Sequence, residues 1–353
     1  MLTIEGRKIG DGQPVFIVFE AGATHGGLES AKELVRHSVE AGADAIKFQI
    51  LDPARLVPDK AQLFSYEILI NSETREKQEV SEPLYDILMR RYLTFDQWRE
   101  LKQYCDDLDI IFFCTATFEN EVDFLKSIGV DTLKICSGDI DHLPFIRYCA
   151  RTGMSIQLDT GNATIGEVEK AYDQVLKTGN NRVIIHNCPS GYPARLESIN
   201  LKTIVTLKQL FGCPIAFSDH TMGWEMDIAA IALGANIVEK TITENRECKG
   251  PEHLFSLEPM DMRRFVKSIR DLETALGNHR KLISEAEYKR GKNTRRSIVL
   301  KKEVKKGDVI DGNALDYARP GTGIEPCMAD VILGKKFTRE LVPGAELSWG
   351  DFE

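Results

Sequence analysis

The sequence contains no apolar run approaching the ~18 residues that a membrane span requires. Charged residues already appear at Glu5, Arg7 and Lys8, so we expect no secretory signal peptide. The eight cysteines form no Cys-x-x-Cys pair, which argues against a zinc ribbon or a dithiol redox motif. No segment is of low complexity. These absences predict a soluble, cytoplasmic protein with reduced thiols and no membrane partner.

An excess of positive charge is also absent, because the net charge is −9 and the isoelectric point is near 5.5. Binders of nucleic acids or anionic membranes carry a basic surface, so we expect neither partner. An anionic substrate would need positive charge supplied locally. The 353 residues suffice for one barrel of about 250 residues and a small second domain.

Eight short apolar runs each end in polar, chemically capable residues, and helix-length segments separate them. The runs span residues 15–19, 45–48, 110–113, 132–136, 155–158, 182–185, 214–217 and 236–238. This alternation predicts an α/β protein with a (β/α)8 TIM barrel, whose site lies at the C-terminal ends of the strands. The connection at 51–93 is unusually long, as in lids or substrate-binding loops.

The character of the sequence changes after residue 279. We assign residues 1–282 to the barrel, the polar stretch 283–293 to a linker and residues 294–353 to a small β-rich domain with Gly-centred turns. About 60 residues are marginal for independent stability, so we expect this domain to pack on a barrel.

Two lysines are predicted to point into the barrel, because successive residues of a strand face opposite sides. Lys47 and Gln49 share one face of the second strand, and Lys134 repeats the arrangement on the fourth. Either the lysines bind a phosphate or carboxylate, or they form internal salt bridges with Glu20 or Glu239. Hydroxyl donors at the same strand ends are Thr115, Ser137, Ser190 and Ser218.

An imidazole follows the seventh strand directly, at His220, with Asp219 beside it. Histidine is the commonest metal ligand and titrates near neutral pH. The alternative is a loop histidine next to a helix-capping aspartate. On the eighth strand, Glu239 and Thr241 share the inward face, and Lys240 takes the other.

Several motifs occur in register along nearly the whole chain. They are EAGATHGG at 20–27, GADAIKFQ at 42–49, CTAT at 114–117, KICSGD at 134–139, DTGN at 159–162, SDHT at 218–221, GPEHLFSLEP at 250–259 and RPGTG at 319–323. Together they resemble the sialic acid (N-acetylneuraminate) synthase family, which carries a C-terminal antifreeze-like (SAF, β-clip) domain. They are also close to synthase-like proteins of spore-coat polysaccharide biosynthesis.

The resemblance implies a transferase that condenses phosphoenolpyruvate with an N-acylated amino sugar similar to N-acetylmannosamine. The products would be a nonulosonic acid, for surface or spore-coat polysaccharide, and phosphate. Phosphoenolpyruvate would be held by Lys47, Thr115, Lys134, Ser137, Ser190 and Ser218. The sugar would be held by Glu20, Gln49, Asp139, Tyr192, Glu252 and Arg319. The catalytic residues would be Glu20, Lys47, Lys134, Asp139 and His220.

The resemblance further implies a divalent metal, manganese or magnesium, with His220 as a ligand. It also implies a homodimer in which each SAF domain covers the barrel mouth of the other subunit and brings Arg319 to the acylamino group. The family's second metal histidine is Thr241 here, so weak metal binding is expected. Other departures are Thr24 for Asn, Asp139 for Glu, Asp159 for Ser and Glu252 for Asp.

Two alternatives to the synthase follow from these departures and from the inward lysines. One is a Schiff-base aldolase with Lys47 or Lys134 as the reactive amine. The other is a divergent barrel with impaired catalysis that binds a sugar without turning it over.

Overall fold

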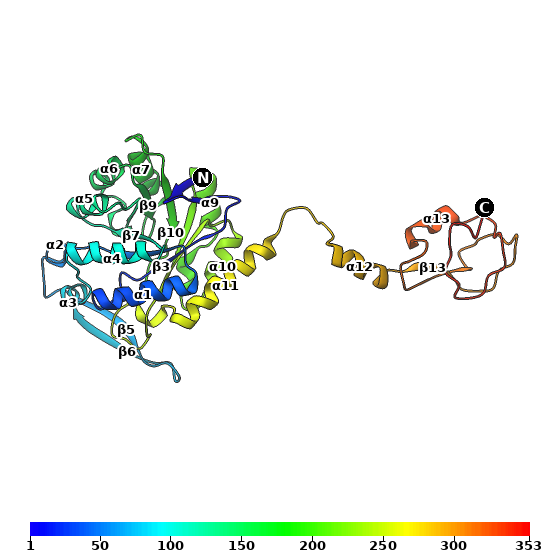
Figure 1. The fold of residues 1–353 in the computed structure, drawn as a ribbon, viewed down its shortest axis with the longest axis horizontal. Coiled ribbons are helices and arrows are strands. Elements are labelled where there is room, and N and C mark those ends of the chain that lie inside the picture. Colours follow the sequence, from blue (N-terminus) through cyan, green and yellow to red (C-terminus); the bar gives the residue numbers. More distant parts are fainter. The chain divides into compact units, whose positions relative to one another are not determined.

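The computed structural model describes residues 1–353 and divides the chain into two compact units, Met1–Gly277 and Asn278–Glu353 (Figure 1). The first unit is a closed barrel of eight parallel strands surrounded by helices. The second is a small domain with an antiparallel strand pair and its own apolar core. The predicted fold class is therefore confirmed.

All eight predicted barrel strands are present. They are β3 (Phe16–Glu20), β4 (Ala45–Gln49), β7 (Ile111–Thr115), β8 (Thr132–Ile135), β9 (Ser155–Asp159), β10 (Val183–Asn187), β11 (Ile215–Asp219) and β12 (Ile237–Thr241). The sheet closes in the order β10-β11-β12-β3-β4-β7-β8-β9. Seven of them end one to three residues later than predicted, because the polar residue at the tip still belongs to the hydrogen-bonded ladder. The chemically capable side chains thus sit on the rigid barrel wall.

Helices cover the outside of the barrel. They are α1 (Leu28–Ala41), α4 (Phe95–Asp107), α5 (Glu119–Ser127), α6 (Leu143–Arg151), α7 (Ile165–Leu176), α8 (Leu196–Ile199), α9 (Thr203–Phe211), α10 (Glu225–Ala232) and α11 (Pro259–Leu276). Outward residues of the strands pack against them, as Phe19 does on Phe265 with ring centroids 5.8 Å apart. Burying such a side chain contributes roughly 1.5–3 kcal/mol. None of the helices combines the length and apolar character that crossing a bilayer needs.

The long connection at 51–93 has its own secondary structure. It contains α2 (Pro53–Leu56), the antiparallel hairpin of β5 (Leu63–Asn71) and β6 (Glu76–Pro83), and α3 (Leu84–Met89). A small apolar cluster of Leu51, Val57 and Leu88 anchors it. The remaining strands of this unit, β1 (Leu2–Ile4) and β2 (Arg7–Ile9), form an N-terminal hairpin.

The second unit contains α12 (Glu285–Thr294), the strand pair β13 (Ser297–Leu300) and β14 (Leu315–Ala318), and α13 (Ala329–Ile332). The segment expected to be a linker, 283–293, is therefore mostly the helix α12. Its start is fixed by a capping box, in which Ser284 and Glu287 satisfy each other's backbone N–H groups. No residue of α12 is buried, although the Lys292 carbonyl accepts a hydrogen bond from the Gly321 backbone N–H at 2.7 Å.

Candidate active site

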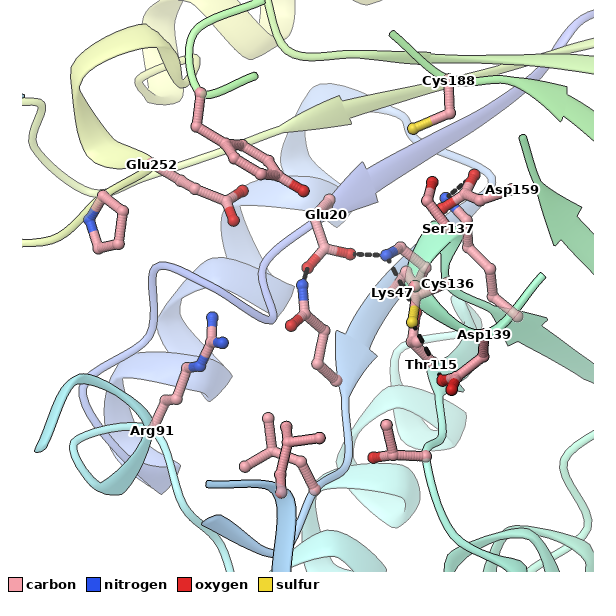
Figure 2. A pocket seen from close by; sticks show the side chains of 18 of the residues that line it. Glu20, Lys47, Arg91, Thr115, Cys136, Ser137, Asp139, Asp159, Cys188 and Glu252 are labelled. Carbon is pink, nitrogen blue, oxygen red and sulfur yellow. Dashed lines mark hydrogen bonds and ion pairs between the residues drawn. The ribbon is translucent and has the colours of Figure 1, made fainter. Parts of the chain in front are cut away.

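A cavity of about 460 Å³ opens at the C-terminal ends of the barrel strands (Figure 2). Ten of the residues predicted for the site line it: Glu20, Lys47, Gln49, Thr115, Lys134, Ser137, Asp139, Tyr192, His220 and Glu252. Eight of these belong to strands or follow a strand end by at most four residues, which is why they converge. The long connection adds Leu56, Phe64, Leu84, Ile87 and Arg91 to the wall.

Both inward lysines form buried ion pairs. Lys47 Nζ contacts the Glu20 carboxylate and lies 3.3 Å from Glu239 Oε1. Lys134 Nζ lies 2.7 Å from the same Glu239 oxygen and 3.0 Å from Asp159 Oδ1. The internal salt bridges that the sequence left open are therefore present. We call these five residues the lysine network; it holds three carboxyl groups against two ammonium groups.

The ion pairs with carboxylates keep both lysines protonated. Burial alone would lower the pKa of Lys47 and Lys134, but the neighbouring carboxylates outweigh burial and raise both pKa values. For Glu239, burial is in turn outweighed by Lys134 and Lys47, so its pKa falls well below the usual range. The network thus contains two fixed cations next to one fixed anion.

Asp159 is the carboxyl group that departs from this pattern. Its burial, together with the Glu239 carboxylate, raises the pKa of Asp159 although Lys134 opposes the shift. Asp159 Oδ1 also lies 3.3 Å from Ser218 Oγ. Protonating Asp159 would leave the network with equal numbers of positive and negative charges.

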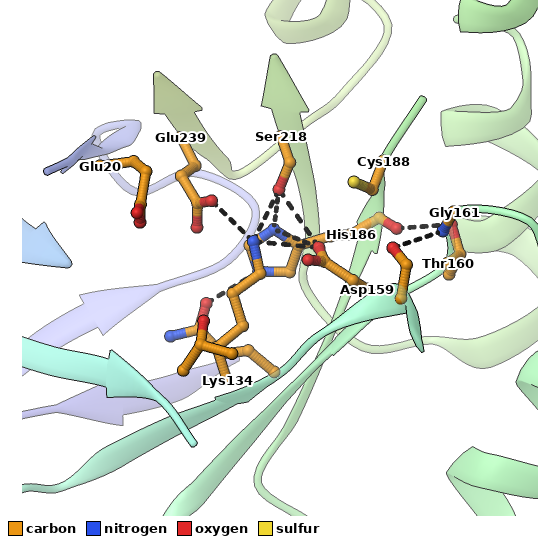
Figure 3. A network of polar contacts seen from close by, with 12 residues as sticks. Glu20, Lys134, Asp159, Thr160, Gly161, His186, Cys188, Ser218 and Glu239 are labelled. Carbon is orange, nitrogen blue, oxygen red and sulfur yellow. Dashed lines mark hydrogen bonds and ion pairs between the residues drawn. The ribbon is translucent and has the colours of Figure 1, made fainter. Parts of the chain in front are cut away.

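A chain of hydrogen bonds below the cavity orients Ser218 (Figure 3). His186 Nε2 lies 2.8 Å from Gln157 Oε1, and His186 Nδ1 lies 2.8 Å from Ser218 Oγ. Because the amide oxygen can only accept, Nε2 carries the proton and Nδ1 accepts from Ser218. Lys134 Nζ then donates to Ser218 Oγ over 2.9 Å. Burial first, and Lys134 second, lower the pKa of His186 far below the usual range, so the ring is neutral.

His186 and Gln157 were not predicted for the site. Both are polar residues inside otherwise apolar strands, which is the signal that could have revealed them. Arg91 was also missed. It lies in the irregular connection after α3, and Figure 2 shows Arg91 and Glu252 across the cavity from Ser137 and Asp159.

Carboxyl groups also line the side of the cavity near Arg91. Glu20 Oε1 accepts hydrogen bonds from the Gly22 backbone N–H at 2.8 Å and from Gln49 Nε2 at 3.1 Å. Burial and the Glu20 carboxylate raise the pKa of Glu252 to about 7. Glu252 can therefore give or take a proton near neutral pH.

The predicted metal ligand, His220, faces the cavity beside Tyr192, with ring centroids 4.8 Å apart. Its Nδ1 donates to the Pro189 carbonyl at 3.4 Å, which leaves the Nε2 lone pair available. Burial and Lys134 lower the pKa of His220 to about 4, so the ring is neutral. Thr241 is buried, and its hydroxyl has no hydrogen-bond partner.

These residues do not form a metal site by themselves. No group of three or more His, Cys, Asp or Glu side chains is arranged to hold a metal ion. Lys240 is unavailable because it lies on the other face of β12, in a buried ion pair with Asp219. The donors present are one imidazole and a hydroxyl, which suit a divalent transition metal poorly.

Three predicted residues lie outside the cavity. Ser218 is buried and contacts the site through Lys134 and Asp159. Ser190 is exposed and donates to Asn162 Oδ1 at 2.7 Å. Arg319 is an exposed residue of the second unit.

Comparisons with known proteins agree with this geometry. The model of the NeuB family matches residues 34–281, and that of the SAF domain matches residues 295–353. An N,N'-diacetyllegionaminic acid synthase of Legionella pneumophila is 35% identical over 349 residues, which cover 98% of this chain and 96% of that protein. The N-acetylneuraminate-9-phosphate synthase of Homo sapiens is 32% identical, over 86% of this chain and 83% of that protein.

Solved structures show the same likeness. The N-acetylneuraminic acid (sialic acid) synthetase of Leptospira borgpetersenii superposes with a TM-score of 0.71 at 29% identity, covering 82% of this chain and 94% of that one. The spore coat polysaccharide biosynthesis protein SpsE of Bacillus subtilis gives 0.66 at 28% identity, covering 100% and 99%.

Proposed function

The chain belongs to the NeuB family, and from this premise we propose that it condenses phosphoenolpyruvate with an N-acylated amino sugar to give a nonulosonic acid and phosphate. The observation that carries the proposal is the lysine network at the end of the barrel. Lys47 and Lys134 place two fixed positive charges in the cavity of a protein whose net charge is −9. Ammonium groups bind phosphate and carboxylate as point charges, which suits phosphoenolpyruvate.

Phosphoenolpyruvate would lie over Lys47 and Lys134, with hydroxyl donors from Thr115 and Ser137. Both lysines are already paired, so the incoming anion competes with Glu239 and Asp159. Protonation of Asp159 removes one competing charge, and its raised pKa favours that form. Neutral Asp159 could also donate a hydrogen bond to the bound anion.

The sugar would occupy the side of the cavity formed by Glu20, Gln49, Tyr192 and Glu252, with Asp139 near the other substrate. C3 of phosphoenolpyruvate forms a bond to C1 of the open-chain sugar, whose carbonyl oxygen becomes a hydroxyl. Water adds at C2, and phosphate leaves from the same carbon. Glu252 is suited to move one of the protons, because its pKa of about 7 lies near neutral pH.

A divalent metal, manganese or magnesium, remains a prediction for this site. With His220 as the one imidazole, we expect weak retention of the metal by the free protein. We assign no step of the reaction to it. Thr241 is the position at which a second ligand would be expected from the family pattern.

We also propose a homodimer in which each SAF domain covers the partner's barrel mouth. A domain of this size gains stability by burying surface against another body. Arg319 would then supply a guanidinium to the acylamino group of the sugar. Light scattering at micromolar concentration measures the assembly, and a monomer would remove Arg319 from the site.

The pairing of the lysines weighs against a Schiff-base aldolase. An amine must be unprotonated to attack a carbonyl, whereas Lys47 and Lys134 have raised pKa values in this network. Borohydride in the presence of pyruvate should therefore trap no adduct. The divergent sugar-binding protein is the other alternative, and only turnover separates it from the synthase.

The test is release of inorganic phosphate from phosphoenolpyruvate across a set of N-acyl hexosamines, with and without Mn²⁺. We expect release that depends on one of the sugars and is lost in Lys134→Met. The matched control is Lys177→Met, which removes an exposed lysine of the outer surface. No sugar-dependent release under any condition would contradict the proposed reaction.

A further inference from the structure

The hairpin of β5 and β6 and the loop after β12 come from distant parts of the sequence and lie side by side at the barrel mouth. At the hairpin turn, the Ser72 backbone N–H donates to Glu247 Oε1 over 2.8 Å. The strand β5 also packs on the short 3-10 helix His253–Phe255. Both segments line the cavity, the hairpin through Phe64 and the loop through Glu252. Their relative position therefore shapes the side of the cavity that we propose for the sugar.

The contacts between these segments converge on Glu82, a residue of β6. Arg90 Nη2 lies 2.6 Å from Glu82 Oε1, and Arg90 Nη1 lies 3.0 Å from Oε2, so the guanidinium binds both carboxylate oxygens. From the loop after β12, Lys249 Nζ donates to Oε2 at 2.8 Å. The Tyr66 hydroxyl of β5 donates to Oε1. One carboxylate thus joins the hairpin, the end of α3 and the loop after β12.

This cluster differs from an isolated ion pair on the surface. The Glu82 side chain is only 12% exposed. Hydrogen bonds from Arg90, and then from Lys249 and Tyr66, outweigh burial and lower the pKa of Glu82 to about 2, so the carboxylate stays charged at neutral pH. Isolated exposed ion pairs contribute little to stability, whereas a bidentate arginine–carboxylate pair within a network holds its partners in a defined geometry.

Glu82 itself does not line the cavity, so it acts on a substrate only through its partners. Arg90 is followed directly by Arg91, which lines the cavity. Lys249 precedes Glu252, another lining residue, by three positions. Each partner of Glu82 is therefore a short chain distance from a group that faces the substrates.

The loop that carries Glu252 is held differently on its two sides. On the C-terminal side, Ser256 Oγ donates to the Glu252 carbonyl at 2.5 Å, and the buried His253 has its Nδ1 2.7 Å from Thr243 Oγ. On the N-terminal side, the one hydrogen bond made by residues 249–251 is that of Lys249 with Glu82. Removing the Glu82 carboxylate therefore frees one side of Glu252 and leaves the other side fixed.

We propose that Glu82 is a positioning residue for the side of the cavity that takes the sugar. Its bond to Lys249 fixes the loop that carries Glu252. Its two bonds to Arg90 fix the segment that carries Arg91. The inference rests on the proposed synthase reaction for the role of Glu252 in proton transfer. The lysine network shares no contact with Glu82, so the proposal concerns one substrate and not the other.

Steady-state phosphate release by Glu82→Gln tests the proposal. The acceptor is N-acetylmannosamine, or the N-acyl hexosamine with the highest rate in the set described above. We expect the KM for the sugar to rise at least about fivefold and the KM for phosphoenolpyruvate to stay within about twofold, because a misplaced group weakens the binding of the ligand that it touches. Lys249→Met should reproduce part of the effect, and the double variant should lose no more than Glu82→Gln alone, since the two residues form one interaction.

The matched control is Glu67→Gln, which removes another carboxylate of the same hairpin. Glu67 is half exposed and pairs with Lys77 of the hairpin at 3.1 Å, so its loss should leave both KM values unchanged. Hydrogen–deuterium exchange of the free proteins adds a measurement that needs no turnover. Residues 247–253 should exchange faster in Glu82→Gln than in wild type or Glu67→Gln, with β4 and β8 unchanged. Thermal melting of each variant verifies that it is folded.

The outcomes separate the positioning role from the reaction. An unchanged KM for the sugar, or equal increases in KM for both substrates, would overturn the positioning role and leave the proposed reaction intact. Faster exchange of residues 247–253 with an unchanged KM for the sugar would show that Glu82 is purely structural. If no sugar supports phosphate release, the proposed reaction fails and the exchange measurement decides alone. Faster exchange in Glu82→Gln then supports control of this loop by Glu82, and unchanged exchange overturns it.

Discussion

Two groups of residues lie on different sides of the barrel mouth. One is the lysine network, and the other, which we call the arginine rim, consists of Arg91, His25 and Glu252. They differ in whether their polar groups have partners within the protein. In the lysine network every charged group already has a partner within the protein. In the arginine rim, buried donors on Arg91 and His25 have none. A ligand at the lysine network must therefore compete with protein partners, whereas the buried donors of the arginine rim have none to give up. Within the lysine network, removing a positive charge should weaken the binding of an anion, and removing a negative charge should strengthen it.

The largest effect should come from Lys134→Met. The substitution leaves Glu239 and Asp159 buried without their common cation, which costs about 3–5 kcal/mol when a buried pair is broken. We expect kcat/KM for phosphate release to fall at least about 100-fold and the melting temperature to drop. A fall in melting temperature with unchanged kcat/KM would show that the lysine is purely structural.

The opposite sign is expected from Asp159→Ser, which removes a competing carboxyl group. Phosphoenolpyruvate should bind about tenfold more tightly at pH values above the raised pKa of Asp159, since a tenfold change corresponds to about 1.4 kcal/mol and one nearby charge can supply that much. The pH dependence provides the control. Wild type should lose affinity as pH rises through the raised pKa of Asp159, because the protonated form is the one that tolerates an anion. In Asp159→Ser that loss should disappear, and calorimetry over a pH series measures both slopes.

Much of this arrangement was predictable, because strand alternation depends only on local sequence. The inward faces of β4, β8 and β12 followed from it directly, as did the separation of Lys240 from Glu239. The partners of Lys47 were predicted only as an alternative to ligand binding. Whether an inward lysine forms an ion pair within the protein depends on its distance to carboxylates on other strands. The alternation along a single strand does not determine these distances.

The arginine rim was not predictable in the same way. Arg91 lies at the end of a 43-residue connection, 51–93, whose path over the barrel mouth is set by its own hairpin and not by barrel periodicity. His186 differs, since it lies on a strand. It is the fourth of the five residues of β10 and directly follows the apolar run predicted at 182–185, so alternation alone could have placed it on the strand.

A smaller effect is expected from His186→Leu. The leucine would leave Gln157 Oε1 without a donor and Ser218 free to rotate away from Lys134, and an unsatisfied buried group costs about 1–3 kcal/mol. We expect the KM for phosphoenolpyruvate to rise several-fold with a smaller change in kcat. His186→Gln, which keeps one acceptor and one donor, should recover part of the loss. A variant that loses only stability, with KM unchanged, would remove His186 from the positioning of Ser218.

The smallest effect concerns metal affinity. Thr241→His would add an imidazole on the inward face of β12, where the threonine hydroxyl has no partner. Mn²⁺ should bind the variant more tightly than wild type, with a partial gain because the orientation of the new ring is not supported by neighbours. Electron paramagnetic resonance of free Mn²⁺ measures the change. Tight binding to wild type without substrate, or no gain in the variant, would contradict the weak-site interpretation.

The central claim is that the lysine network binds phosphoenolpyruvate, and one calorimetric titration tests it most directly. Phosphoenolpyruvate is titrated into wild type, Lys47→Ala and the surface control Lys177→Ala at one pH and ionic strength. We predict a dissociation constant at least tenfold higher for Lys47→Ala and an unchanged one for Lys177→Ala, because Lys47 lines the cavity and Lys177 does not. Equal dissociation constants for wild type and Lys47→Ala would contradict the claim.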